Sequence, residues 1–166
     1  IIYNMLCDDR GGSMIIDLKK IFVNDNSALP IEYELDMSQE EFAGVFPLNN
    51  PVKFVALVSN KASLVQLSAR ISYDYAAGCD RCGKPTTKSY TVEIEKSLAP
   101  SIEGEESDSI ILVPDMKLDL DEFVYTEVIT SLPMKHLCAE NCKDKGVSAI
   151  KAALKAKAKD MEEQDV

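Results

Sequence analysis

The stretch Cys79-Asp-Arg-Cys-Gly-Lys-Pro85 lies between two segments in which apolar and polar residues alternate. Before it, residues 64–75 alternate over twelve positions, and after it residues 88–96 alternate again. A period of two is typical of an antiparallel strand with one buried face. Gly83, which follows the second cysteine directly, favours a tight turn between the two segments. The sequence therefore predicts a long β-hairpin that carries two cysteines at its tip.

Further strands and one helix are predicted around this hairpin. Residues 31–35, 52–58 and 110–113 are short apolar or alternating segments of the kind found in strands, whereas residues 14–22 fit a helical turn or a strand. Two capping patterns predict helix starts, one at Ser38–Glu41 and one at Asp119–Glu122. The second helix has apolar residues on one face, at Leu120, Phe123, Val124, Val128 and Leu132.

These segments predict an α+β fold. We expect a mainly antiparallel β-sheet that curls towards a barrel, an amphipathic helix after it, and a C-terminal helix rich in Lys and Ala. Residues 14–146 are expected to form one domain, and residues 147–166 a helical or disordered charged tail. Residues 1–13, which include Cys7 and end in Gly-Gly-Ser, are expected to be upstream or expression-derived sequence before a natural start at Met14.

The charge distribution limits the class of partner. The chain has 166 residues and a net charge of −10, which argues against a simple basic nucleic-acid binder. Residues 143–159 are an exception, because they hold six Lys and one Asp. We expect this basic segment to be able to touch RNA and the acidic body to meet a basic protein, although a solvated polar tail explains the lysines equally well.

The apolar segments predict a cytoplasmic protein that does not enter a membrane. No apolar run approaches the roughly 18 residues that cross a bilayer. The apolar start Ile1-Ile-Tyr3 is interrupted by Asn4 and by the charged residues 8–10, unlike a signal peptide. In a reducing compartment, paired cysteines are more often metal ligands or redox groups than structural disulfides.

Four cysteines in two close pairs predict a structural zinc site made of Cys79, Cys82, Cys138 and Cys142. A zinc ion prefers four sulfur or nitrogen ligands in a tetrahedron, and two loops with two cysteines each supply them. Three alternatives remain: thiols without a metal, a redox-active dithiol, and replacement of one cysteine by His136. The redox alternative is weaker because a strand, and not a helix N-terminus, follows the first pair.

Signals of catalysis are otherwise absent from the sequence. It contains no nucleophile elbow, no phosphate-binding Walker loop and no dinucleotide-binding glycine motif. A single histidine leaves little choice of a base beside a nucleophile. The acidic run Glu103–Asp108 is expected to be a solvated loop. We therefore expect a protein that is not an enzyme and has no small-molecule substrate.

Several of these motifs together resemble the YceD family, which is named for large ribosomal RNA subunit accumulation. The resemblance covers roughly residues 14–146, and its most specific parts are Cys79-Asp-Arg-Cys82, Leu118–Val124, Ser131-Leu-Pro133 and the block from His136 to Lys143. By position, the residues that match the family pattern are Cys79, Arg81, Cys82, Cys138 and Cys142. The sequence departs from many members after Lys143, where they continue with further cysteines.

The resemblance implies a bacterial ribosome-biogenesis factor that supports 23S rRNA accumulation and assembly of the large subunit. The implied partner is ribosomal RNA or a basic large-subunit ribosomal protein. Contacts with it are expected from the basic residues Arg81, Lys143, Lys145, Lys151 and Lys155. The competing hypotheses are a dithiol/disulfide oxidoreductase that uses the cysteine pair and a chaperone-like binder of a ribosomal protein.

Overall fold

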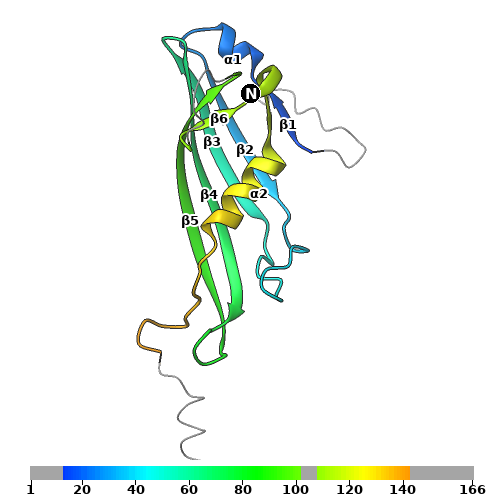
Figure 1. Cartoon of the computed structure of the whole chain (residues 1–166), viewed down its shortest axis with the longest axis vertical. Coiled ribbons are helices and arrows are strands. Elements are labelled where there is room, and N and C mark those ends of the chain that lie inside the picture. Colours follow the sequence, from blue (N-terminus) through cyan, green and yellow to red (C-terminus); the bar gives the residue numbers. More distant parts are fainter. Residues whose placement is uncertain (1–12, 102–107, 143–166) are drawn as a thin grey trace, which may run out of the picture.

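A computed structural model describes residues 13–101 and 108–142 of the chain. Its main element is a five-stranded sheet in the order β2-β3-β4-β5-β6, in which successive strands from β2 to β5 are antiparallel and β6 runs parallel to β5. The sheet curves like half of a barrel, with helix α2 across one face (Figure 1). The strands are β2 (Ala28–Leu35), β3 (Val52–Lys61), β4 (Leu64–Gly78), β5 (Pro85–Ala99) and β6 (Ile110–Leu112).

Shorter elements close one end of this sheet. Strands β1 (Ile15–Asp17) and β7 (Lys117–Asp119) pair in antiparallel fashion beside helix α1 (Lys19–Val23) and the 3-10 turn η1 (Pro114–Met116). The segment 14–22 thus contains both the strand and the helical turn that were alternatives for it. The expected α+β class is confirmed. The curved sheet does not close into a barrel, because β2 and β6 are edge strands within the described part of the chain.

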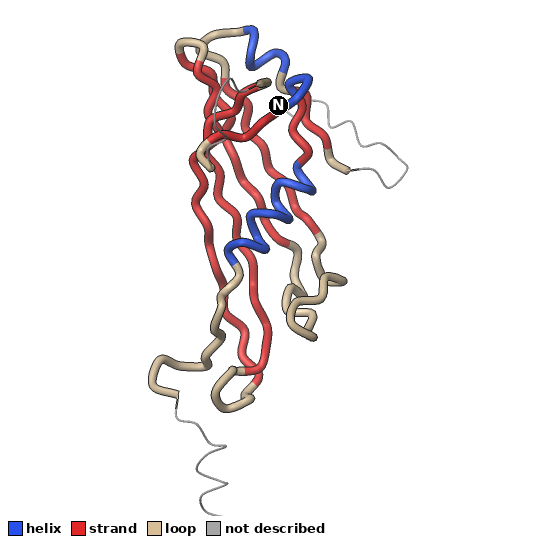
Figure 2. The backbone as a smooth tube through the Cα atoms, in the orientation of Figure 1, coloured by secondary structure: helices blue, strands red, loops and turns tan. Residues whose placement is uncertain are grey.

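The period of two in β3 and β4 explains the core. Every second residue of β4 from Val65 to Tyr75 is buried, and the same holds for β3 from Val52 to Val58. Helix α2 (Leu120–Ser131) covers these side chains with Leu120, Phe123, Val124 and Val128, all of them buried. Figure 2 shows the helix along this inner face of the sheet. The other face of β3 exposes Val55 and Leu57 to solvent.

The start and the end of α2 follow from local sequence. The Asp119 carboxylate accepts a hydrogen bond of 3.1 Å from the Glu122 N–H, which satisfies one of the free donors at the helix start. Asp121 and Glu122 in the first turn suit the positive end of the helix dipole. At the other end Leu132 leaves the helical conformation, with a ψ of 140°, and Pro133 follows it, so the helix stops. The predicted helix start at Asp119 is confirmed.

The helix predicted at Ser38–Glu41 is wrong, because Ser38 and Gln39 lie in a turn and Glu40 and Glu41 in irregular chain. The Asp36 carboxylate accepts a 2.9 Å hydrogen bond from the Ser38 N–H, which makes a local turn in place of a helix cap. A few residues later Phe42 and Val45 pair across Ala43 and Gly44, both with positive φ. The chain reverses direction there, so no helix follows the capping pattern.

Some predicted segments lie outside the described residues. These are the start of the chain to residue 12, most of the acidic loop Glu103–Asp108, and everything from Lys143 onward. The expected Lys/Ala-rich helix is therefore untested. Within the described ranges, no helix has the length and apolar character needed to cross a membrane.

Strands β4 and β5 extend beyond the rest of the sheet as a long two-stranded arm. Their pairing continues without a bulge from Val65↔Leu98 to Gly78↔Pro85. In Figure 1 the arm points away from α1 and β1, and the segment after α2 returns to its tip. The predicted hairpin is confirmed, and its tip carries Cys79 and Cys82.

Candidate metal centre

The first cysteine loop is shaped by its own backbone. The Cys79 N–H donates to the Lys84 carbonyl at 2.9 Å, and the Gly83 N–H donates to the Cys79 carbonyl at 2.8 Å. Gly83 has a φ of +72°, which glycine adopts without steric cost. The tight turn brings the two thiols of one loop to the same side, as the spacing of two intervening residues predicts.

The second cysteine loop comes from the segment after α2. Pro133 ends the helix, and residues 134–142 run along the hairpin arm to its tip (Figures 1 and 2). There the Cys142 N–H donates to the Ala139 carbonyl at 3.1 Å, which curls the loop so that both of its thiols face the hairpin.

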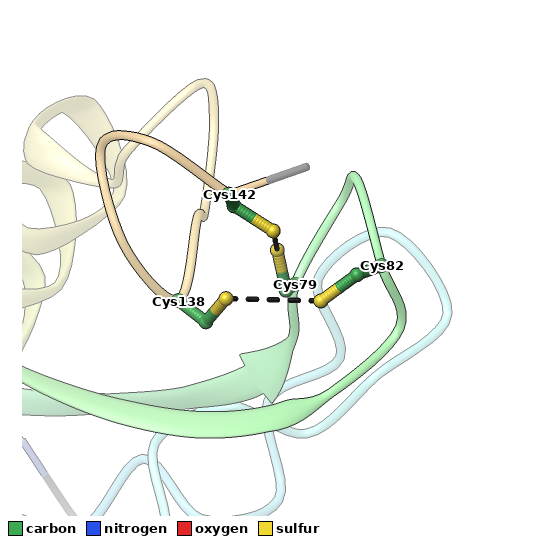
Figure 3. A group of neighbouring side chains, drawn as sticks. All are labelled: Cys79, Cys82, Cys138 and Cys142. Carbon is green, nitrogen blue, oxygen red and sulfur yellow. Dashed lines mark hydrogen bonds between the residues drawn. The ribbon is translucent and has the colours of Figure 1, made fainter. Parts of the chain in front are cut away.

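The two loops bring all four predicted cysteines into one cluster (Figure 3). The Sγ atoms of Cys79 and Cys142 are 3.8 Å apart, and those of Cys82 and Cys138 are 3.7 Å apart. All four sulfurs lie within 4.8 Å of one another. A tetrahedral zinc ion with Zn–S bonds of about 2.3 Å separates its sulfur ligands by roughly 3.8 Å. The donor set and its spacing therefore fit a four-thiolate metal ion, and the four residues could hold one.

Electrostatics at the cluster favour uptake of a cation. The backbone N–H of Cys138 lowers the pKa of Cys79 to about 6, with further help from the Arg81 and Cys82 N–H groups and against the effect of burial. The contact with the Cys138 sulfur, and then that with Cys82, raises the pKa of Cys142 to about 12. One thiolate thus forms readily while a neighbour retains its proton. A divalent cation would displace such protons and offset the repulsion among the sulfurs.

Asp80 and His136 join the two loops through a reciprocal pair of hydrogen bonds. The Asp80 N–H donates to the His136 carbonyl at 2.8 Å, and the His136 N–H donates to the Asp80 carboxylate at 2.6 Å. This pair, which we call the loop clamp, was missed by sequence reasoning. The position of Asp80 inside the first cysteine pair was the only available signal, since a backbone partner 56 residues away leaves no trace in the spacing.

His136 is not one of the grouped metal-binding residues of the described chain, which are all cysteines. Its side chain is buried, with 3% of its surface exposed. The ring Nε2 lies 3.0 Å from the Thr86 carbonyl, and the ring packs 5.1 Å from that of Tyr75. Because the ring makes these contacts with the hairpin and His136 is not grouped with the four cysteines, replacement of a cysteine by His136 is not supported.

Aromatic rings connect the centre to the helix. Tyr73 stacks on Tyr90 with ring centroids 5.7 Å apart, and Tyr75 meets Tyr90 edge to face at 6.5 Å. The Tyr73 hydroxyl donates to the Ser131 carbonyl at the end of α2, at 3.1 Å. This aromatic row, completed by His136, packs on the arm between the end of α2 and the cysteine loops.

The predicted contact residues are placed only in part. Arg81 lies at the centre, where its guanidinium donates to the Cys142 carbonyl at 2.6 Å and so spans the two loops. The lysines at 143, 145, 151 and 155 lie outside the described residues. Their role in binding remains a prediction.

A curved sheet with four grouped thiols at the end of its longest hairpin defines an α+β protein with a candidate tetrathiolate centre. Residues 67–166 match the family described as "Large ribosomal RNA subunit accumulation protein YceD". The match covers more than half of the chain and includes all four cysteines, so the chain belongs to the YceD family. Comparisons with curated proteins and with solved structures give no match.

Proposed function

We propose that this protein is a non-catalytic ribosome-biogenesis factor that supports 23S rRNA accumulation and assembly of the large subunit. Membership of a family named for large ribosomal RNA subunit accumulation carries this proposal. The four grouped thiols support a structural role for the centre, because they are held between two loops and offer four ligands with no separate open position. The metal proposed for the centre is zinc.

The zinc proposal is tested by metal content. Purified protein is expected to hold one zinc ion per chain. Loss of a residue that only hydrogen-bonds to a metal ligand typically lowers metal affinity roughly 10- to 100-fold. Cys82→Ser removes a proposed ligand itself and is therefore expected to lower zinc affinity by more than that. Cys7→Ser removes a thiol that does not belong to the predicted site and serves as the control. Zinc retained at full stoichiometry by Cys82→Ser, or absent from protein purified under reducing conditions, would reject the assignment.

The biological role is tested by complementation. In bacteria that lack their own family member, this chain is expected to restore 23S rRNA levels, measured relative to 16S rRNA. Cys82→Ser is expected to fail and Cys7→Ser to succeed, provided that both variants accumulate to similar levels. Normal 23S rRNA in the strain without the factor would refute the proposed role itself.

The proposed partner is ribosomal RNA or a basic ribosomal protein. Lysines 143, 145, 151 and 155 are proposed to contact RNA phosphates. Their joint replacement by alanine is then expected to reduce the slope of log affinity against log salt by about three, since each phosphate contact contributes ~0.7–0.9. Replacement of four exposed lysines of the body, at 19, 53, 61 and 117, is the matched control.

Capture of a ribosomal protein without RNA would favour a chaperone-like role for the same protein. In that case both lysine variants are expected to bind the ribosomal protein like the wild type, because the acidic body and not the basic tail would make the contact. A pull-down analysed for both RNA and protein separates the two roles.

A dithiol oxidoreductase is a second candidate, favoured by the lowered pKa of Cys79, which is about 6. A thiolate that forms near neutral pH can attack a disulfide. Burial of Cys79, of which 3% is exposed, opposes that role because a substrate disulfide must reach the sulfur. Insulin reduction by the metal-free protein, lost in Cys79→Ser, would support this candidate, whereas inactivity would reject it.

A further inference from the structure

The outer face of the sheet, opposite helix α2, carries exposed apolar side chains on strand β3. Val55 and Leu57 lie on this face, with 53% and 45% of their surfaces exposed. Pro30 of the neighbouring strand β2 pairs with Leu57 and is also exposed. We call Pro30, Val55 and Leu57 the outer stripe. The residues that surround the outer stripe decide what can bind to it.

The register of the strands places these residues in two rows that run across the sheet from β2 to β5. The first row is Glu32, Val55, Arg70 and Glu93, and the second row is Pro30, Leu57, Ser68 and Glu95. Glutamates therefore flank the outer stripe on both sides. The two rows together carry a net charge of −2, and the next row is neutral because Glu34 lies opposite Lys53.

The flanking carboxylates are available to a basic partner. Glu32 and Glu95 form no ion pair within residues 13–101 and 108–142. Glu93 pairs with Arg70 at 2.7 Å, but 64% of the arginine side chain and 71% of the glutamate side chain are exposed. An ion pair in such an exposed position contributes little to stability, so a cation from a partner can replace it at small cost.

A hollow of about 260 Å³ lies beside the outer stripe, between β4 and β5. Its lining includes the polar residues Gln66, Ser68, Ser97 and Ser109 together with Glu95. Lys96 also lines the hollow, but its ammonium group is bonded to Glu127 of α2 on the other face of the sheet. A polar hollow with a carboxylate that has no ion-pair partner fits the end of a lysine or arginine side chain.

The spacing of these groups matches the dimensions of an α-helix. Strands β2 and β5 are three strand spacings apart, which is about 14 Å at ~4.8 Å each. A helix with its side chains is about 10–12 Å wide, so basic residues on its two flanks reach both rows of glutamates. Along β3, Val55 and Leu57 are about 6.7 Å apart, close to the ~6 Å between helical residues i and i+4.

We propose that the outer stripe and its flanking glutamates bind a basic amphipathic helix of a partner protein. The inference rests on the proposed function for the class of partner, a basic protein, and adds the surface and the element that meet. Apolar side chains of the helix cover Val55 and Leu57, one flank pairs with Glu32, and a basic side chain of the other flank enters the hollow at Glu95. RNA and a second copy of the chain are disfavoured, because both are negatively charged like this face.

A synthetic peptide tests this surface. The probe is a labelled helical peptide of leucine and lysine with all leucines on one face, titrated with the full chain while its fluorescence anisotropy is measured. Val55→Ser combined with Leu57→Ser is expected to weaken binding roughly 10- to 100-fold, because the leucines lose their apolar contact. Glu32→Gln combined with Glu95→Gln is expected to weaken it about three- to tenfold and to reduce its salt dependence. A peptide of equal composition with scattered leucines is expected to bind no better than to the serine variant.

Matched controls separate this surface from the general negative charge of the protein. Val23→Ser combined with Ile15→Ser removes two apolar side chains that are 77% and 48% exposed elsewhere. Glu41→Gln combined with Glu140→Gln removes two exposed carboxylates away from the outer face. Both control variants are expected to bind the peptide like the wild type. Amide spectra verify that all variants fold, and the peptide is expected to shift the amides of residues 55, 57, 70 and 95.

Three results would overturn the inference. The first is equal affinity of the wild type and both outer-face variants for the peptide. The second is a shift of the amides of residues 55 and 57 when lysines 143, 145, 151 and 155 are replaced without peptide, since the chain's own basic segment would then cover the face. The third is self-association that is lost with Val55→Ser and Leu57→Ser, which would make a second copy the occupant.

Complementation separates a failure of this inference from a failure of the proposed function. If the chain restores 23S rRNA but the peptide does not distinguish the outer-face variants from their controls, the inference alone is overturned. If the chain does not restore 23S rRNA, the proposed role is refuted, while selective binding of the peptide still supports the outer stripe as a docking surface for a basic helix.

Discussion

Asp80 is the residue whose side chain most directly ties the two cysteine loops together. Its carboxylate accepts the His136 N–H at 2.6 Å, a hydrogen bond to a charged group. Asp80→Ala is therefore expected to destabilise the protein by about 1.5–3 kcal/mol and to weaken metal binding by roughly 10- to 100-fold, because the second loop loses its anchor. Unfolding in urea and competition with a zinc chelator measure the two effects.

Glu140→Ala is the control for this prediction. Glu140 is an exposed acidic residue on the second cysteine loop, so its replacement removes the same charge near the same site. It is expected to change stability by no more than about 0.5 kcal/mol. Equal effects of the two variants would show that charge, and not the loop clamp, matters at this site.

The spacing of the sulfurs predicts which disulfides form when metal-free protein is oxidised. Cys79 contacts Cys142 at 3.8 Å and Cys82 contacts Cys138 at 3.7 Å, each across the two loops. With hydrogen peroxide, each pair of thiols is expected to give one disulfide and two water molecules. Peptide mapping by mass spectrometry is expected to find these two cross-loop bonds. Predominant bonds within each loop, such as Cys79 to Cys82, would contradict the arrangement.

Among the elements, helix α2 depends on one aromatic contact with the sheet. Phe123 meets the fully buried Phe54 edge to face, with ring centroids 6.0 Å apart. Phe123→Ala is expected to lower the free energy of unfolding by about 3–5 kcal/mol, because it leaves a cavity between helix and sheet. Thr126→Ala, at an exposed position of the same helix, is expected to stay within about 0.5 kcal/mol of the wild type in the same urea titration.

The elements that sequence reasoning predicted are those with strong internal periodicity. Strands β4 and β5 alternate over many residues, and α2 begins with a cap and ends at a proline, so local chemistry specifies them. The helix predicted from the capping pattern at Ser38–Glu41 is wrong, because such a motif is only a few residues long and does not specify a helix by itself. Asp36 bonds to the Ser38 N–H, and this competing turn decides the local conformation.

At the scale of the whole molecule, the metal centre lies at the end of the arm and the main core lies elsewhere. Most of the core is built from β3, β4 and α2, with individual buried side chains from the other elements, whereas the four cysteines of the centre lie in the hairpin tip and in residues 138–142. Chelation of the metal is therefore expected to raise amide exchange in residues 76–88 and 134–142 while β3 keeps its protection. Global loss of protection on chelation would mean that the core depends on the metal.

The sequence by itself determined the α+β class, the hairpin, the four cysteines and the family. Each of these depends on periodicity, on local spacing or on motifs that can be read in order along the chain. The tertiary structure shows how the two predicted cysteine pairs meet, and it alone decided that Asp80 and His136 clamp their loops and that the His136 ring contacts Thr86. It also decided which face of the sheet is uncovered. These features arise between residues far apart in sequence, where the free energy of packing and hydrogen bonding, and not local propensity, selects the partner.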